Sequence, residues 1–316
     1  MKQLFRDVDG GPLCPEGSVA CIGAFDGLHL GHRALVRQAA ARARALGLPL
    51  AALSFEPLPR EFFARGAPLP RLMLPRARAE GLWALGADVV GLLRFNDGFA
   101  AMSPHAFSER VLAGRLRARE VWVGPGFRYG SRRAGDLATL RASGDALGFA
   151  AGEIEPLRLD GERVSSTRIR AALRAGDFAC AAHLLGRPYS IGGRVVRGRQ
   201  LGRTLGYPTA NLRFGGREPP LQGVYATRVH GVDDAPRPSV SSFGTRPTVD
   251  GAEPLLEAHL FDFDGDLYGR RIEVEFVARL RDEEKYPDLP TLVAQMDRDA
   301  AQARHILMQT PQRATA

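Results

Sequence analysis

The sequence predicts an α/β protein in two parts, an N-terminal half with a parallel sheet and a C-terminal half that forms an antiparallel β-barrel with a terminal helix. The chain has 316 residues, which suits two domains at about 150 residues each. In the first half, apolar strand-like runs alternate with helical segments, a pattern typical of parallel sheets covered by helices. After residue 187 the runs become short, β-rich and interrupted by glycine or proline, as in small barrels.

The first half contains four expected strands and three expected helices. The strands are expected at 18–22, 50–55, 88–93 and 120–123, and the helices at 33–46, 77–85 and 104–116. In the first helix, apolar residues recur at helical spacing and arginines occupy the other face. Ser103 is a suitable N-cap for the third helix. A loop rich in glycine and histidine joins the first strand to the first helix.

A purely helical stretch at 167–185 precedes the change to β-rich sequence. The segment 186–189 marks the expected boundary, which divides the chain into domains of residues 1–186 and 187–316. Strict alternation at 271–277 places Ile272, Val274 and Phe276 on one face of a strand. A final helix is expected at 289–308, with Asp288 as its cap.

Composition narrows the class of protein. Hydrophobic residues make up 45% and charged residues 25% of the chain, which is ordinary globular usage and excludes a disordered or fibrous protein. The three cysteines are too few for a disulfide framework or a zinc site. The first ten residues are too polar for a signal peptide, and no apolar run is long enough to span a membrane. We therefore expect a cytoplasmic protein.

The net charge of +8 comes almost entirely from arginine, since Lys2 and Lys285 are the only lysines. A positive balance is compatible with nucleic acid, an acidic membrane or phosphate-bearing substrates as partners. Biased codon usage explains an Arg- and Ala-rich chain equally well. Charge alone therefore leaves the partner open.

The most informative segment is the loop 23–32, which contains His29 and His32 around Gly31 at the start of a helix. A helix N-terminus supplies unpaired N–H donors and a partial positive charge. Imidazoles can add hydrogen bonds to phosphate oxygens, and a glycine lets the backbone approach closely. Two histidines without a third ligand are weak evidence for a metal. The loop therefore predicts an anion site.

This segment resembles the His-x-Gly-His signature of the nucleotidyltransferase superfamily, whose members join ATP or CTP to a phosphate-bearing substrate. The second expected signature is found at 164–170, where hydroxyls at a helix start are followed by cations. By itself such a run is an ordinary N-cap, but its pairing with the histidine motif favours a nucleotide site. The resemblance implies a Rossmann-like nucleotidyltransferase domain.

The intervening segments 55–63, 94–100, 123–130 and 135–136 look like the FMN adenylyltransferase half of prokaryotic bifunctional FAD synthetases. The resemblance implies that His29 and His32 are catalytic and stabilise charge at the α-phosphate of ATP, and that Asn96 and Phe127 bind flavin. It also implies that Ser166, Thr167 and Arg170 hold the triphosphate. The full set of implied nucleotide-binding residues in this half is Gly23, Phe25, Asp26, Gly27, Gly31, Ser165, Ser166, Thr167 and Arg170.

One position departs from that family. Gly126 stands where the family usually has Asp or Asn before the phenylalanine of its Gly-x-Asp-Phe loop. The change removes a side-chain hydrogen-bonding group, so the adenylyltransferase step is either weakened or supported by another residue. Because both anion-binding motifs are intact, we favour the interpretation that this half contains an active site.

A second cluster lies in the C-terminal half, at 193–198 and 205–212. Glycines let backbone N–H groups surround a phosphate, and Thr209 and Asn211 offer the hard oxygen ligands that Mg²⁺ prefers. The cluster resembles the riboflavin kinase signature, as do the segments 223–226 and 244–248. The resemblance implies nucleotide binding by Gly198, Gly206, Pro208, Thr209 and Asn211, with Thr209 and Asn211 as the metal ligands.

Glu257 is the catalytic candidate of this half. A carboxylate beside Mg·ATP can orient the riboflavin 5′-hydroxyl and accept its proton, and the segment after Glu257 matches the one that follows the family's catalytic glutamate. The segment 279–286 matches the flavin-side flap of the family, which implies that Arg281 contacts flavin. Taken alone, a glutamate on a strand or a charged loop is more often a solvated surface.

Three functions stay under consideration. The first is a bifunctional enzyme that phosphorylates riboflavin to FMN and adenylylates FMN to FAD, with ATP as co-substrate and Mg²⁺ as cofactor. The second is a riboflavin kinase whose other half is weakened by Gly126. The third is an Arg-rich nucleic-acid-binding protein, which the scattered arginines and the lack of an RNA-stacking motif disfavour. The first implies riboflavin, FMN, FAD and ATP as ligands and neither nucleic acid nor membrane as partner, with weak self-association left open.

Overall fold

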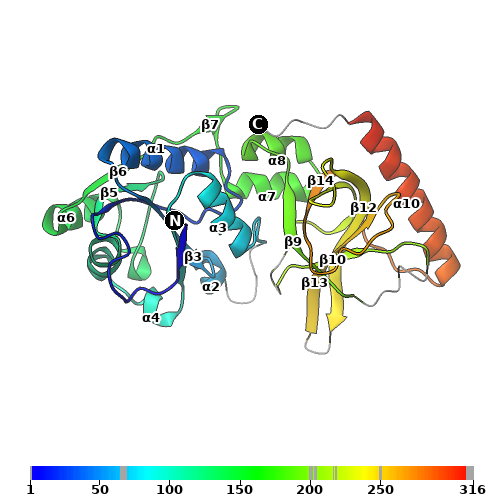
Figure 1. The fold of residues 1–316 in the computed structure, drawn as a ribbon, viewed down its shortest axis with the longest axis horizontal. Helices are drawn as coiled ribbons and strands as arrows, with labels where there is room; N and C mark the ends of the chain where they lie inside the picture. The colour runs from blue at the N-terminus through cyan, green and yellow to red at the C-terminus, as the bar shows by residue number, and fades with distance from the viewer. Residues whose placement is uncertain are drawn as a thin grey trace. The chain divides into compact units, whose positions relative to one another are not determined.

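The computed structural model describes residues 2–64, 70–198, 202, 205–215, 217, 219–248 and 251–310. The chain forms two compact units. The first consists of Met1–Leu69 and Pro75–Ser166, and the second of Pro70–Leu74 and Thr167–Ala316. Figure 1 labels their helices and strands. The domain boundary expected after residue 186 is a division of the sequence and stays a prediction.

The first unit is built on a six-stranded sheet in the order β1-β4-β3-β2-β5-β6. Every neighbouring pair of strands runs parallel, so the expected fold class of this half is confirmed. The strands are β1 (Gln3–Phe5), β2 (Ser18–Ile22), β3 (Leu50–Glu56), β4 (Val89–Arg94), β5 (Ala118–Val123) and β6 (Ala150–Glu153). All five residues of β2 are buried, as expected for a central parallel strand covered on both faces.

Helices follow the strands of this sheet (Figure 1). They are α1 (Leu30–Leu46), α2 (Pro59–Phe63), α3 (Pro75–Ala84), α4 (Asp97–Ala100), α5 (Pro104–Phe107) and α6 (Leu137–Leu147), and a small hairpin is formed by β7 (Arg158–Leu159) and β8 (Glu162–Arg163). The Ser103 hydroxyl accepts the N–H of Ala106 and caps α5, as expected. The sequence analysis did not anticipate β1, α6 or β6.

The helix expected at 104–116 is regular only in its first turn. It continues from Ser108 to Arg115 as a π-helix, and the N–H of Leu116 donates to the carbonyl of Val111, five residues earlier. This wider turn brings two residues five apart to the same side of the helix. Val111 and Leu116 are both completely buried in the core of the first unit, which the usual helical period would not allow.

The stretch expected to be one helical run at 167–185 is two helices, α7 (Ser166–Arg174) and α8 (Phe178–Leu185). The break lies at Gly176, whose φ of 75° is left-handed, and such a residue commonly ends a helix. Asp177 then caps α8 by accepting the N–H of Cys180. The expectation of uninterrupted helix was therefore wrong at this point.

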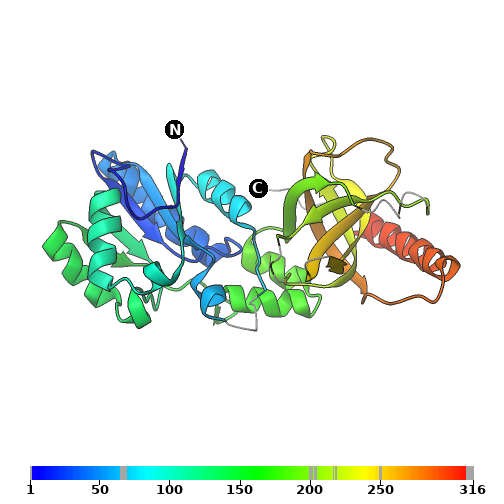
Figure 2. The same ribbon diagram turned by 90° about the horizontal axis from the view of Figure 1, so that it is seen from below.

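The second unit contains a closed six-stranded antiparallel barrel in the order β10-β13-β12-β11-β14-β9. Its strands are β9 (Ser190–Val196), β10 (Ala210–Arg213), β11 (Gly223–His230), β12 (Arg237–Thr248), β13 (Gly251–Leu260) and β14 (Arg271–Arg281). The helix α10 (Leu289–Gln309) lies along the outside of the barrel (Figure 2), and Asp288 caps it by accepting the N–H of Thr291. The expected barrel and terminal helix are confirmed.

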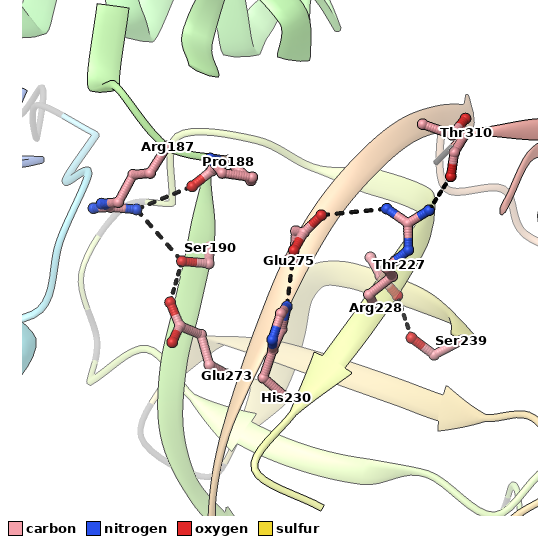
Figure 3. Close-up of polar contacts among 10 residues, drawn as sticks. All are labelled: Arg187, Pro188, Ser190, Thr227, Arg228, His230, Ser239, Glu273, Glu275 and Thr310. Carbon is pink, nitrogen blue, oxygen red and sulfur yellow. Dashed lines mark hydrogen bonds and ion pairs between the residues drawn. The ribbon is translucent and has the colours of Figure 1, made fainter. Parts of the chain in front are cut away.

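Helix α10 is fixed to the barrel by apolar and polar contacts. Ala303 and Leu307 pack against Ala226 and Phe261. The guanidinium of Arg228 donates to the carbonyls of Leu307 and Thr310 at the end of the helix, and it also pairs with Glu275, which His230 contacts from its other side (Figure 3). A cation at this position suits the negative end of a helix dipole.

None of the helices in the described part of the chain has the length and apolar character needed to cross a membrane.

Candidate functional site

The histidine loop lies where the strand order of the parallel sheet reverses. The chain passes from β2 to β3 on one side of β2, whereas β5, reached later, pairs with its other side. The loop 23–29 follows β2, and the loop that contains Gly126 follows β5. Ligands of open α/β sheets bind in the crevice outside the carboxyl ends of the strands at such a switch point. The topology therefore brings two of the predicted segments to one binding position.

His29 is the N-cap of α1. Its Nδ1 accepts the backbone N–H of His32 at 3.2 Å, so a neutral His29 carries its proton on Nε2. Its side chain is buried, with 6% exposed. His29 therefore presents a ring N–H at the positive end of a helix, which is the chemistry that an anion site needs.

His32 stacks on His29, with ring centroids 3.6 Å apart and an interplanar angle of 15°. Its Nδ1 is buried and has no hydrogen-bond partner within the described structure. Burial, with smaller electrostatic contributions from the neighbouring His29 and Arg163 side chains, holds the pKa of His32 well below its usual value. His32 is therefore neutral at physiological pH, with a ring nitrogen left for a ligand.

Gly31 leaves room for the ring of His29. A Cβ at position 31 would lie 3.2 Å from Cε1 of His29, so the ring would have to shift by a few tenths of an ångström. The glycine therefore favours the observed position of the His29 ring at the start of the helix. This is a more specific role than the sequence indicated.

Arg78, which was not among the predicted site residues, holds the histidine loop through hydrogen bonds from the protein interior. Its guanidinium, completely buried on α3, donates to the carbonyl of Ala24 at 3.1 Å, to that of Phe55, and to the carboxylate of Glu56. The buried Ser54 hydroxyl donates to the same Ala24 carbonyl. The signal in the sequence is an arginine on the same helical face as Ala79 and Leu82, which are also buried.

The hydrogen bonds from Arg78 and Ser54 matter because two residues of the loop other than glycine have left-handed backbone conformations. Phe25 has a φ of 51° and Leu28 a φ of 46°, and both side chains are buried. Each such residue costs about 1 kcal/mol or more. The hydrogen bonds to Ala24 help to hold the loop in this conformation, with Gly23 and Gly27 at its turns.

The segment 164–170, which carries the serine and threonine hydroxyls, contacts the same loop through Ser166. Ser166 is the first residue of α7, and its Oγ donates to the carbonyl of the buried Asp26 at 2.9 Å. Ser165 directly precedes the helix. Thr167 and Arg170 follow along α7 as part of the second unit, and Arg170 is buried with its Nε donating to the carbonyl of Pro70.

Aromatic side chains gather near the carboxyl ends of the sheet strands. Phe127 stacks on Tyr129, with centroids 5.2 Å apart. Edge contacts connect a second set of rings, which comprises Phe55, Phe62, Phe63, Phe95 and Phe99. Asn96 lies between Phe95 and Phe99 and caps α4, its Oδ1 accepting the N–H of Phe99. Of the predicted flavin residues, Phe127 thus contacts another aromatic ring, and Asn96 lies in the segment that carries Phe95 and Phe99.

Gly126 has a left-handed φ of 71°, and no atom lies within 4 Å of the position that its Cβ would take. Its N–H donates to Oε1 of Glu153 at 3.1 Å. Asparagine and aspartate tolerate left-handed backbone better than other non-glycine residues. Position 126 therefore has room for a side chain, in a backbone conformation that glycine adopts most readily.

In the second unit, the predicted kinase residues meet on β10 and β13. Asn211 of β10 lies directly opposite Glu257 of β13 in the antiparallel register. Side chains of such a pair share one face of the sheet, with Cβ atoms about 5 Å apart. Leu256 and Ala258, on either side of Glu257, point into the barrel core. The barrel thus places a carboxylate beside the candidate nucleotide segment.

The Asn211 side chain is oriented for a ligand. It is 4% exposed, and its Nδ2 donates to the carbonyl of Thr209 at 3.2 Å. Its Oδ1 is buried and has no partner within the described structure. At Gly198 a Cβ would stand 2.9 Å from this carboxamide, so the glycine keeps the space beside it open. The Thr209 hydroxyl lies 3.4 Å from Nδ2 of Asn211, and an orphaned amide oxygen is a ligand that fits a hard cation such as Mg²⁺.

Arg281, the last residue of β14, is held by Asp299 of α10. Its Nε and one of its NH2 groups donate to the Asp299 carboxylate, with the shortest contact at 2.7 Å, and NH1 donates to the carbonyl of Asp282. This pairing raises the pKa of Arg281. Its guanidinium therefore anchors the segment 279–286 to α10, and direct contact with flavin stays a prediction. Gly206 and Pro208 are exposed in the segment before β10.

Two family models match the chain, one in each half. The model described as FAD synthetase matches residues 12–168, and the model described as riboflavin kinase matches residues 185–307. A crystal structure described as a macrolide-efflux protein from Streptococcus pneumoniae shares the fold, with a TM-score of 0.76 and 29% identity, and the match covers 96% of this chain and 98% of that one. The order of the two models agrees with the order of the motifs.

Curated relatives match nearly the whole chain. Bifunctional riboflavin kinase/FMN adenylyltransferases from Haemophilus influenzae and Escherichia coli are 40% and 42% identical over 303 residues, which cover 96% of this chain and 98% and 97% of theirs. The protein of the same name from Pseudomonas fluorescens is 43% identical over 305 residues, 96% of this chain and 97% of its own. With both domain models and these relatives in agreement, the chain belongs to the bifunctional riboflavin kinase/FMN adenylyltransferase family, whose members form FMN from riboflavin and FAD from FMN.

Proposed function

We propose that the barrel phosphorylates riboflavin at the site formed by Asn211 and Glu257. The observation that carries this assignment is their cross-strand pairing, which joins a carboxylate to an oriented amide oxygen. Glu257 accepts the proton of the riboflavin 5′-hydroxyl as that oxygen attacks the γ-phosphorus of ATP and ADP leaves. Positioning and charge stabilisation supply most of the catalysis in such transfers.

Thr209 and Asn211 are the residues that would hold Mg²⁺. The orphaned Oδ1 of Asn211 supports this role, since an amide oxygen is a ligand that Mg²⁺ accepts while it keeps several waters. Bound Mg²⁺ would neutralise the charge on the ATP phosphates. The hydrogen bonds from Nδ2 to the carbonyl and the hydroxyl of Thr209 fix the orientation of the Asn211 carboxamide.

Glu257→Gln tests the carboxylate. We expect FMN formation to fall by roughly 10²–10⁴-fold, the usual contribution of a general base, while conversion of FMN to FAD by the same protein is unchanged. Chromatographic separation of flavins after incubation with riboflavin, ATP and Mg²⁺ measures both. Asp264→Asn, an exposed carboxylate in the turn after β13, is the matched control. Normal FMN formation by Glu257→Gln would exclude Glu257 as the base.

Asn211→Ala tests the proposed metal ligand. The Mg²⁺ concentration that gives half-maximal riboflavin phosphorylation should rise roughly tenfold or more, because loss of a ligand weakens the remaining coordination. Titration of Mg²⁺ at saturating ATP and riboflavin measures the shift. The dependence of FAD formation on Mg²⁺ serves as the internal control and should stay the same. An unchanged titration for the kinase would remove Asn211 from the metal site.

For the first unit we propose that His29 and His32 bind the α-phosphate region of ATP. An oxygen of the FMN phosphate attacks the α-phosphorus, and pyrophosphate leaves. The Nε2–H of His29 and the neutral ring of His32 donate hydrogen bonds to the oxygens on which charge develops. Ser165, Ser166, Thr167 and Arg170 remain our candidates for the triphosphate, with the contact from Ser166 to Asp26 in support.

His32→Ala should lower FAD formation by roughly 10²–10³-fold, as expected when a preorganised donor to a developing oxyanion is lost. Riboflavin phosphorylation by the same protein should be unaffected. His105→Ala, a histidine exposed on α5 of the same unit, is the control for the loss of an imidazole. If FAD formation survives in His32→Ala at the rate of that control, His32 has no part in the reaction.

The aromatic rings around Phe127 and Phe95 support flavin binding in the first unit, because the isoalloxazine is a flat ring system that stacks on aromatic faces. The place of Asn96 at the start of α4, next to Phe95 in the sequence, supports a polar contact to the same ligand. Both remain proposals, as does a cytoplasmic location for an enzyme that consumes ATP in both reactions.

Gly126→Asn tests whether the missing side chain limits FAD formation. Position 126 has open space for a side chain, and asparagine tolerates a left-handed φ better than most non-glycine residues, so we expect the variant to fold and its kcat/KM for FMN to rise about two- to tenfold, the effect of one added hydrogen bond. Gly126→Ala, with the same backbone demand and no polar group, should be slower than the natural enzyme. No gain in Gly126→Asn would indicate that another group, such as the Glu153 carboxylate, already compensates.

A further inference from the structure

We propose that His259 and Asp297 are positioning residues of the kinase, which hold Tyr207 and Pro208 and thereby place Thr209 and Asn211 for the nucleotide and metal. This inference rests on the kinase site proposed above. It concerns three elements of the second unit that lie far apart in the sequence: the segment before β10, strand β13 and helix α10.

His259 makes the first of the two contacts that hold the segment before β10, which we call ties. It lies two residues after Glu257 on β13, and thus on the same face of the strand. Its Nδ1 is 2.9 Å from the carbonyl oxygen of Pro208. Because a carbonyl can only accept, the proton of His259 is on Nδ1. Burial lowers the pKa of His259, so the ring remains a neutral donor to Pro208 at physiological pH.

Tyr207 connects this contact to α10. Its ring packs against the ring of His259, with centroids 4.9 Å apart, and its hydroxyl donates to the carboxylate of Asp297. Burial and the contact with Asp297 raise the pKa of Tyr207 to about 12. The phenol therefore keeps its proton and remains a donor at physiological pH.

Helix α10 can act as an anchor because other contacts hold it in place. Asp299, two residues after Asp297, is buried in its pairing with Arg281 of β14. Arg304 pairs with Asp262 and lies over the ring of Phe261, 4.2 Å from its centroid. None of these contacts needs Tyr207. The tie from Asp297 to Tyr207 therefore fixes the nucleotide segment to a helix that is already secured.

The two ties act on consecutive residues directly before Thr209. Pro208 is held through its carbonyl and Tyr207 through its ring and hydroxyl. Loss of either would let Thr209 and Asn211 depart from the geometry that nucleotide and metal require. The expected signature is weaker binding of ATP, with less effect on the turnover of the bound complex and none on riboflavin affinity.

The experiment compares paired variants in the full-length enzyme. Tyr207→Phe and Asp297→Ala remove the tie to α10, and His259→Leu removes the tie to Pro208. Asp297→Asn keeps an acceptor for Tyr207, and His259→Asn keeps a donor near the position of Nδ1. Asp234→Asn, an exposed carboxylate between β11 and β12, is the control for the loss of a charge.

We expect the KM for ATP in riboflavin phosphorylation to rise roughly three- to tenfold in the variants that remove a tie, as for loss of a hydrogen bond. The KM for riboflavin should stay constant, and Asp297→Asn and His259→Asn should recover most of the affinity. FAD formation from FMN by the same preparations reports on the integrity of the rest of the chain. A partly unfolded barrel would lower kcat and leave KM unchanged, which is a different result.

Two outcomes separate this inference from the proposed site. If Glu257→Gln and Asn211→Ala impair the kinase as expected but Tyr207→Phe leaves the KM for ATP unchanged, the positioning role is wrong and the site stands. If Glu257→Gln is fully active, the site itself is wrong. Should His259→Leu fail to fold, Tyr207→Phe and Asp297→Ala still decide the question, because both remove the hydrogen bond between Tyr207 and Asp297, whose side chains are not buried.

Discussion

The pairing of β10 with β13 is the constraint on which the kinase site depends. Asn211 faces Glu257 only in one register, and a slip of one residue would turn the glutamate into the barrel. The buried side chains of Leu256, Ala258 and Leu260 on β13 prevent such a slip, since each would have to leave the core. The apolar alternation of β13 thus fixes the position of the Glu257 carboxylate, our candidate base, relative to β10, a strand of four residues.

The candidate site of the first unit is formed by a loop and not by a pair of strands, so its shape must be fixed in a different way. The loop after β2 needs backbone conformations that its residues disfavour, so it is held by side chains from β3 and α3. Arg78 brings a charge into the interior for this purpose, and Glu56 supplies the opposite charge. A buried pair of this kind contributes little net stability but makes the removal of one partner costly. We interpret it as a means of fixing the shape of the anion site.

The sequence predicted correctly those parts of the protein in which a local residue pattern is compatible with only one structure. Buried strands such as 18–22, the cap at Ser103 and the alternation at 271–277 all depend on local chemistry, and all were confirmed. The break at Gly176 was missed because a glycine inside a helical pattern is often tolerated. Arg78 and Asp297 were missed because their partners, Ala24 and Tyr207, are distant in the sequence. The position of Arg78 on the apolar face of α3 indicates burial but not its partner, and no local pattern distinguishes Asp297 from an ordinary surface charge.

The contacts of the arginine side chains explain what the net charge of +8 indicates about function. Several arginines of the described chain are engaged with carboxylates, as in the pairs Arg42–Glu120, Arg281–Asp299 and Arg304–Asp262. Others hold backbone carbonyls, as Arg78 and Arg228 do. A guanidinium is suited to this work because it directs several donors in fixed directions. In our proposal, phosphate is recognised through local geometry, by two stacked imidazoles at a helix start and beside an oriented amide on a strand, and the overall charge of the chain does not indicate where either proposed site lies.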